Sequence, residues 1–200
     1  MSRTSVRLAA TAATAVLAVT GLSGAAAADT AAAPATVATG SVVVHESTSF
    51  IQQTAAAGVV VVPLPSGTPA YDSAAGFSAT FPVTGGDANL QAYYDRIELG
   101  GGLLFVNLNT GKTAIFKQLA FQADSWRLTG VPLGGTEPVA LLDPAGDNQI
   151  NRVGTTQTLE AADLKVDAAG AQYVDSKLNT TFFQGGQSIG SLSISFTPAG

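Results

Sequence analysis

The sequence predicts an all-β protein, and three observations support this. Short runs of Val, Ile, Leu and Phe alternate with clusters of Gly, Pro, Asn and Asp along most of the chain. Two segments, 77–83 and 189–196, alternate apolar and polar residues, as strands with one buried face do. Helical features are confined to two short segments. We therefore expect a two-sheet β-sandwich of about ten strands, with two short helices closing its ends.

The predicted strands follow one another through the whole domain. Their ranges are 41–44, 59–63, 77–83, 90–99, 103–108, 113–121, 126–131, 139–142, 156–166 and 189–196. Three glycines at 100–102 fit a hairpin turn, because glycine readily takes positive φ. In the strand 113–121 we expect Phe116 and Gln118 to share one face, with Leu119 and Phe121 on the other.

The two predicted helices span 46–57 and 167–179. The first segment lacks Gly and Pro, offers Ser and Thr as capping residues and stops at Gly58. The second begins at Asp167, which is a good N-terminal cap, and ends at Asn179. Each helix is predicted to connect two strands.

Residues 1–28 have the three parts of a secretory signal peptide. Arg3 and Arg7 form a basic start, residues 8–19 are apolar and uncharged, and small residues at 26–28 offer a cleavage site. The apolar part is too short to span a bilayer, which needs about 20 residues, and no later segment is long and apolar enough. We therefore expect an extracellular protein that is cleaved near Ala28 and not inserted in the membrane.

Composition limits what the remaining 172 residues do. They make one domain, which we expect at 40–200 after a flexible Ala/Thr/Pro lead-in at 29–39. The chain has no cysteine, which excludes disulfides and zinc–thiolate sites. The leader takes two of the nine basic residues and none of the fourteen acidic ones, which leaves a net charge of −7. An acidic chain without a basic cluster is a poor partner for nucleic acid.

His45 is the single histidine of the chain, and Glu46 stands beside it. It is a candidate ligand-binding residue, although a surface or capping role is the simpler interpretation. A Ser–His–Asp site would have to use this histidine, and no Gly-x-Ser-x-Gly motif accompanies it. We predict no catalytic residues and no enzymatic activity.

Tyr93, Tyr94, Asp95 and Arg96 form the densest polar and aromatic cluster. On the predicted strand, Tyr93 and Asp95 would share one face, and Tyr94 and Arg96 the other. Exposed tyrosines often mark a binding surface, but one tyrosine in the core and one at its rim is the alternative. Trp126 is a further candidate ligand platform, although a lone tryptophan in a β-protein is usually part of the core.

Two other groups of acidic residues do not fit a catalytic site or a metal site. Asp95 and Glu98 have odd spacing on a predicted strand, so they would face opposite ways and not act together on one glycosidic bond. The stretch 143–148 is predicted to be a turn-rich loop. With Asn151 it resembles a calcium loop, but it lacks the spaced acidic ligands and the closing Glu. We predict no metal site.

Several motifs resemble the Htaa domain family of secreted bacterial β-domains. They are Gly-Val-Val-Val-Val-Pro-Leu at 58–64, Phe-Pro-Val-Thr-Gly-Gly at 81–86, Gly-Gly-Leu-Leu-Phe at 101–105 and Thr-Thr-Phe-Phe at 180–183. A Gly-Lys turn at 111–112 leads to Gln-Leu-Ala-Phe at 118–121. The resemblance spans nearly 40–197 and implies a β-sandwich with short helices.

Some members of that family bind haem through a Tyr and a His. In this chain those positions fall at Gln53 and Leu99, and neither side chain is an axial ligand of haem iron. The resemblance therefore implies a diverged member that lacks the family's haem contacts, and we predict no bound cofactor.

Three functions stay open at this stage. The first is a non-enzymatic extracellular or cell-surface module that binds an unknown ligand or surface component. The second is a carrier of haem or another hydrophobic ligand that uses Tyr93, Tyr94 or His45. The third is a secreted hydrolase whose site is assembled from distant strands.

Overall fold

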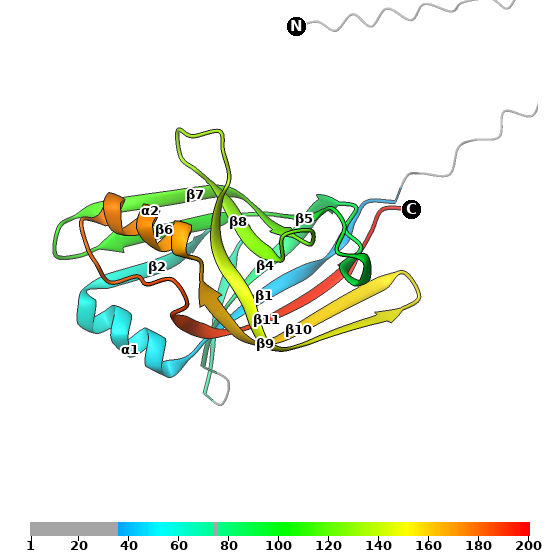
Figure 1. Cartoon of the computed structure of the whole chain (residues 1–200), viewed down its shortest axis with the longest axis horizontal. Coiled ribbons are helices and arrows are strands. Elements are labelled where there is room, and N and C mark those ends of the chain that lie inside the picture. The colour runs from blue at the N-terminus through cyan, green and yellow to red at the C-terminus, as the bar shows by residue number, and fades with distance from the viewer. Residues whose placement is uncertain (1–35, 74–75) are drawn as a thin grey trace, which may run out of the picture. The chain divides into compact units, whose positions relative to one another are not determined.

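The computed structural model describes residues 36–73 and 76–200, and the predicted signal peptide and most of the lead-in lie outside these ranges. The prediction of an all-β fold with two short helices is confirmed (Figure 1). The helices are α1 (Thr48–Ala57) and α2 (Ala168–Leu178). The strands are β1 (Thr39–Glu46), β2 (Val59–Leu64), β3 (Thr68–Asp72), β4 (Gly76–Gly86), β5 (Arg96–Leu99), β6 (Gly102–Asn107), β7 (Lys112–Gln122), β8 (Arg127–Pro132), β9 (Val139–Val153), β10 (Thr156–Val166) and β11 (Ser188–Thr197).

The strands form one sheet that closes on itself. From β7 the order runs β5, β4, β1, β11, β10, β9 and β8, and β8 pairs with β7 again, so that eight strands make a closed barrel. Strands β6 and β2 extend this ring, and β3 pairs with β4. The predicted two-sheet sandwich therefore differs in detail. Alternation identifies the face of a strand that is buried, but not whether the opposite wall belongs to the same sheet.

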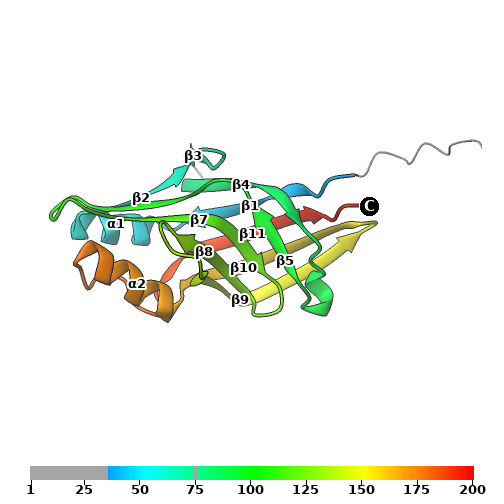
Figure 2. The same ribbon diagram turned by 90° about the horizontal axis from the view of Figure 1, so that it is seen from above.

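Both helices lie at one end of the barrel rather than at opposite ends (Figures 1 and 2). Strands β1 and β10 are each antiparallel to β11, so they run in the same direction. Since α1 follows β1 and α2 follows β10, both helices begin at the same rim. The capping prediction was right: the side chains of Ser47 and Asp167 accept bonds from the backbone N–H groups of Phe50 and Ala169.

A β-bulge at Gln118 bends β7. Residues 112–117 pair with β6, whereas residues 120–122 pair with β5 along the same edge. The register against β8 shifts between Lys117 and Ala120, and Gln118 takes a left-handed φ of 48°. The prediction that Phe116 and Gln118 share a face is therefore wrong, because the extra residue reverses the alternation. Phe116, Leu119 and Phe121 are all buried.

Two predicted segments have a different secondary structure from the one expected. The expected strand 90–99 is a short 3-10 helix, η1 (Leu90–Ala92), followed by a turn and then β5. Tyr93 and Asp95 have φ of 53° and 57°, far from the φ of about −120° to −140° of regular strands. The expected loop 143–148 is part of β9 and pairs with β10. The two strands make one long hairpin whose turn lies at Gly154, where φ is 61°.

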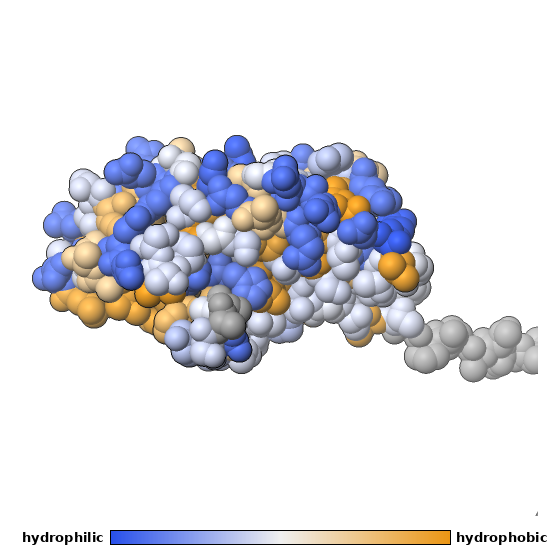
Figure 3. Space-filling view, turned by 90° about the horizontal axis from the view of Figure 1, so that it is seen from below, coloured by the Kyte–Doolittle hydropathy of each residue, from blue (hydrophilic) through white to orange (hydrophobic). Residues whose placement is uncertain are grey.

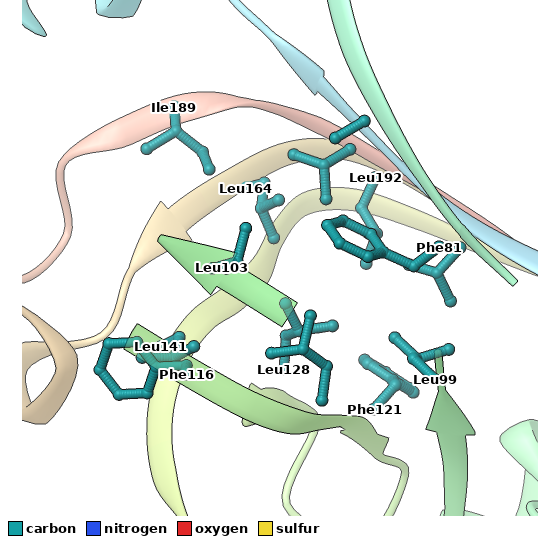
Figure 4. Close-up of a cluster of buried hydrophobic side chains, with 14 of the residues drawn as sticks. Phe81, Leu99, Leu103, Phe116, Phe121, Leu128, Leu141, Leu164, Ile189 and Leu192 are labelled. Atoms are coloured by element: carbon teal, nitrogen blue, oxygen red, sulfur yellow. The ribbon is translucent and has the colours of Figure 1, made fainter. Parts of the chain in front are cut away.

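Phenylalanine and branched aliphatic side chains fill the barrel (Figure 4). Phe81, Phe116, Phe121 and Phe196 are among the largest side chains that are fully buried. They leave an apolar cavity of about 60 Å³ near Leu128 and Val174. An eight-stranded barrel has room for side chains or for one small ligand, and here side chains occupy the interior. A ligand of ordinary size must therefore bind on the outside.

Candidate functional site

Tyr93 and Trp126 are the two predicted site residues that the fold brings together. Their ring centroids are 5.1 Å apart. The indole of Trp126 also contacts the buried ring of Phe121, edge to face, at 5.4 Å. Trp126 is thus half-buried on the core, while 58% of Tyr93 is exposed. We call Tyr93 and Trp126 the aromatic pair.

Both residues of the aromatic pair have left-handed backbone. The φ angles are 53° at Tyr93 and 59° at Trp126. Left-handed backbone is uncommon for bulky residues and costs about 1–2 kcal/mol for a residue with a Cβ atom. Among the residues described, the six non-glycine residues with positive φ include Tyr93, Asp95, Gln118 and Trp126, all in or next to β5, β7 and β8. Such strain is concentrated at functional sites.

Buried hydrogen bonds hold the segment that carries Tyr93. The side chain of Gln157, on β10, is almost completely buried. Its Nε2 donates to the carbonyl of Ala88 at 2.9 Å, and its Oε1 accepts from the N–H of Leu90 at 2.8 Å. The N–H of Asn89 donates to the carbonyl of Tyr94 at 2.9 Å. The turn is therefore fixed from both sides, which offsets its left-handed residues.

A polar groove of about 410 Å³ runs along the outer face of β5, β7 and β8. Its polar wall includes Arg96, Glu98, Gln118, Gln122 and Thr129. The guanidinium of Arg96 donates to Oε1 of Glu98 through Nη2 at 2.9 Å and Nε at 3.1 Å. Ala120, Val131 and Pro138 add small apolar surfaces. We call this depression the outer groove.

The aromatic pair does not line the outer groove itself but belongs to the turns next to the strand ends that border it, where Trp126 packs on the core residue Phe121. Arg96 on β5 is opposite Gln122 on β7, which in turn is opposite Arg127 on β8. Trp126 directly precedes Arg127, and Tyr93 is three residues before Arg96. The N–H of Ala123 donates to the carbonyl of Asp95 at 2.8 Å, which ties the two aromatic turns together.

Tyr94 and His45 are not part of one cluster with the aromatic pair. Tyr94 is 64% exposed in the turn, and the predicted sharing of strand faces in 93–96 was wrong because only Arg96 belongs to a strand. His45 is on β1 opposite Ser78, whereas Ile97 is opposite Gly86, eight residues further along β4. That separation is roughly 25 Å at the rise of a strand.

His45 lines a shallow hollow with Asp163 and Ser188. The hydroxyl of Ser188 already donates to Oδ1 of Asp163 at 2.6 Å. Within residues 36–73 and 76–200, no three His, Asp or Glu side chains gather in a way that could hold a metal ion. In the same ranges, no helix has the length and apolar character needed to cross a membrane.

Arg127 connects two acidic residues at the start of α2. Its Nε lies 3.4 Å from Oδ1 of Asp143 and 3.6 Å from Oδ2 of Asp167. Partial burial and the nearby carboxylate of Asp167 raise the pKa of Asp143, and Arg127 opposes this. Asp167 is the N-terminal cap of α2, so this cluster orients the helix.

Glu46 is on the wall of an apolar hollow at the end of the barrel that carries the helices. Phe50, Val61 and Phe77 line the same hollow. On the face drawn in Figure 3, apolar residues gather towards this end, whereas polar residues cover most of the rest. Burial raises the pKa of the Glu46 carboxyl above its ordinary value of 4.5.

The positions that correspond to the family's haem contacts do not meet. Gln53 is exposed on α1, and its Oε1 accepts from Nε2 of Gln187 at 3.3 Å. Leu99 is buried in the core from β5 (Figure 4). An amide and an alkyl side chain that point to different environments provide no axial ligand for iron.

The prediction from sequence missed the groove residues Gln118, Gln122 and Thr129. One feature of the sequence could have predicted the bulge that places these residues on the outer face. Phe116 and Phe121 are five positions apart, and both are large apolar residues that belong in the core. Strict alternation puts residues five apart on opposite faces, so this spacing indicates a bulge.

Comparison with known proteins gives a structural relative only. No family model matches the sequence, and no curated protein matches it. The chain is similar to the crystal structure of the C-terminal domain of HtaA from Corynebacterium glutamicum, with a TM-score of 0.55 and 15% identity. The match covers 83% of this chain and 99% of that domain. The resemblance to the Htaa family is thus confirmed for the fold, because this chain folds like an Htaa domain.

Proposed function

We propose that this chain is a secreted, non-enzymatic module that binds a ligand outside the cell through the aromatic pair and the outer groove. The observation that carries the proposal is the strained backbone of Tyr93 and Trp126 beside a polar groove. A binding platform benefits from a rigid, exposed ring of this kind.

The charged groups of the outer groove favour binding over catalysis. Arg96 pairs with Glu98, and Arg127 lies between Asp143 and Asp167. Arg96 and Glu98 neutralise each other in the outer groove, whereas Arg127 and its two carboxylates lie outside the groove lining. Acid–base catalysis instead uses titratable groups whose environments push their pKa values towards the working pH, next to a nucleophile or a reacting bond. The outer groove offers a matched ion pair rather than two such groups.

Binding outside the cell is tested by cosedimentation with a bacterial cell-envelope fraction. We expect purified residues 29–200 to sediment with the envelope, and Tyr93→Ala to reduce the bound fraction about tenfold. Tyr71→Ala is the matched control, because Tyr71 is 67% exposed and contacts Phe77, with ring centroids 4.7 Å apart, on another part of the surface. Equal loss in both variants, or no sedimentation, contradicts the proposal.

Secretion rests on the signal-peptide pattern of residues 1–28. When the full chain is expressed in a secreting bacterial host, we expect the protein in the medium or envelope to begin at Asp29. Mass spectrometry of the intact protein measures this. Recovery of the uncleaved chain from the cytoplasm contradicts it.

A haem carrier is the second candidate, because some members of the resembled family bind haem. Tyr93 and Tyr94 expose phenols that are able to ligate iron. Titration with haemin separates the candidates. A Soret shift that Tyr93→Phe or Tyr94→Phe abolishes supports a haem carrier. An unchanged spectrum at micromolar haemin removes it.

A further inference from the structure

We propose that the outer groove and the aromatic pair bind a neutral carbohydrate chain. This inference rests on the proposed function, since it names the class of ligand for the same surface. Four properties of the groove carry it: balanced charge, a mixture of hydrogen-bond donors and acceptors, an aromatic platform at one end, and walls without free strand edges.

The charge of the groove excludes a strongly ionic ligand. Arg96 and Glu98 are the charged side chains among the residues that line it, and Nη2 and Nε of Arg96 both donate to Oε1 of Glu98. An anion would have to displace Glu98 from Arg96, and a cation would have to displace Arg96 from Glu98. A neutral ligand leaves the pair intact and uses its remaining N–H groups and lone pairs.

The polar side chains of the groove suit hydroxyl groups. A sugar hydroxyl both donates and accepts, so it needs partners of both kinds. The carboxamides of Gln118 and Gln122 each offer two donors and one acceptor oxygen, and Thr84 and Thr129 offer hydroxyls. The side chains of Gln122 and Thr129 are only weakly engaged with each other, with Nε2 3.5 Å from Oγ1. The hydroxyl of Thr129 is buried and donates to the carbonyl of Ala120 at 3.3 Å, so the carboxamide of Gln122 is the member of this pair that can bond a ligand.

The aromatic pair supplies the apolar contact that a sugar ring needs. One face of a pyranose ring carries C–H groups, and these pack against aromatic rings. Tyr93 is exposed and is backed by Trp126, which Phe121 supports from the core. The rigid pair therefore presents apolar surface at little cost in conformational entropy. A chain of several sugars would extend from this platform along the groove.

The strands of the groove disfavour an extended peptide as the ligand. A peptide gains most of its affinity in strand addition from the unpaired backbone groups of an edge strand. Along the groove, β5 is paired with β4 and β7, and β7 is paired with β5 and β8. β8 is paired with β9 on its other side. The groove consequently recognises its ligand through side chains.

The test uses neutral oligosaccharides and the fluorescence of Trp126, which is the single tryptophan of the chain. Purified residues 29–200 are titrated with maltotetraose, cellotetraose, chitotetraose and mannotetraose. We expect at least one to change the emission of Trp126 saturably. Raising the NaCl concentration from about 50 mM to about 500 mM should leave the dissociation constant unchanged within about twofold, because screening does not affect a neutral ligand.

Two substitutions locate the site. Gln122→Ala removes outward-facing hydrogen-bonding groups, and Tyr93→Ala removes the platform, so each should weaken binding about tenfold. Tyr71→Ala should leave it unchanged. Binding that survives Gln122→Ala and Tyr93→Ala overturns the assignment of the groove.

Three further outcomes separate this inference from the proposed function. If none of the four oligosaccharides binds while Tyr93→Ala still abolishes cosedimentation with the envelope, the carbohydrate inference fails and the proposed function stands. A strong dependence on salt in place of the expected constancy also overturns a neutral ligand. If the protein neither binds any of the four oligosaccharides nor cosediments with the envelope, the surface is not a binding site.

Discussion

At the scale of single residues, Glu46 shows how the apolar end of the barrel affects stability. Its carboxyl makes no hydrogen bond or ion pair with the residues that the structure describes, and burial raises its pKa. In the unfolded chain the group ionises near its ordinary value of 4.5. The folded state holds the proton to higher pH, so the free energy of unfolding falls as the pH rises from that value through the folded pKa.

Glu46→Gln should therefore raise the melting temperature at pH 7 and change it little at pH 4. At pH 7 the substitution removes a charge that the fold solvates poorly, whereas at pH 4 the native carboxyl is already protonated. Thermal denaturation at both pH values measures the difference. Glu137→Gln, in an exposed turn, controls for the change in net charge. An equal rise at both pH values would rule out burial of the carboxylate as the cause.

Gln118 is the residue where stability and binding are expected to oppose each other. Its left-handed backbone, with φ of 48°, favours glycine. Gln118→Gly should raise the free energy of unfolding by about 1 kcal/mol, or the melting temperature by roughly 2–4 °C. The same substitution removes a carboxamide from the outer groove and should weaken oligosaccharide binding. Urea denaturation measures the gain.

Gln122→Gly is the matched control for that substitution. Gln122 also lines the groove but lies in β7 without positive φ. Glycine there should lower the free energy of unfolding by about 0.5–1 kcal/mol, because it adds freedom to the unfolded chain. If both variants lose stability, the left-handed strain at Gln118 is compensated locally.

At the scale of elements, the segment that carries Tyr93 depends on one buried side chain of another strand. Gln157→Ala leaves the N–H of Leu90 and the carbonyl of Ala88 without their partner in a buried environment. Two such groups cost about 3 kcal/mol together, a fall of roughly 6–12 °C in melting temperature. Amide hydrogen exchange in residues 88–95 should accelerate. Gln149→Ala, exposed on β9, should change neither quantity.

Local chemistry determines how well each element is predicted from sequence. The helices were found within two residues of their bounds, because Ser47, Asp167, Gly58 and Asn179 cap them through neighbouring backbone groups. The turn at Tyr93 was missed because Gln157 holds it from a distance of more than sixty positions along the chain. The bulge at Gln118 was missed because the alternation of β7 was assumed to be unbroken.

At the scale of the whole molecule, the closure of the sheet is the property that sequence periodicity leaves undetermined. β1 pairs with β11 and β4, so the first and last strands of the domain are neighbours. The direction of β1 and β10 places both helices at one rim, and the pairing of β7 with β8 closes the ring. The all-β class follows from the local alternation of apolar and polar residues. These pairings join strands that are far apart in the sequence, so local alternation does not determine them.

The neighbouring ends of the domain allow a sharp test of that topology. β1 and β11 lie side by side (Figure 1). Thr39 is opposite Thr197, and the N–H of Gly200 donates to Oγ1 of Thr36. A circular permutant that joins residue 200 to residue 36 by a short Gly/Ser linker, and that opens at Gly111, should therefore fold. A Cβ at Gly111 would meet no atom within 4 Å, so the β6–β7 turn is exposed there.

We expect the permutant to keep the β-sheet circular dichroism of the parent and to lose no more than about 2 kcal/mol in urea denaturation. The permutant keeps every strand pairing. It loses only the β6–β7 turn and gains the linker between residues 200 and 36. The control permutant opens at Gly190, inside β11, where the backbone touches β1 so closely that a Cβ would lie 1.8 Å from the carbonyl oxygen of His45. It should not fold, because the cut divides β11, the strand that lies between β1 and β10 in the sheet. Equal stability of the two permutants would show that β11 is not an integral strand of the closed sheet.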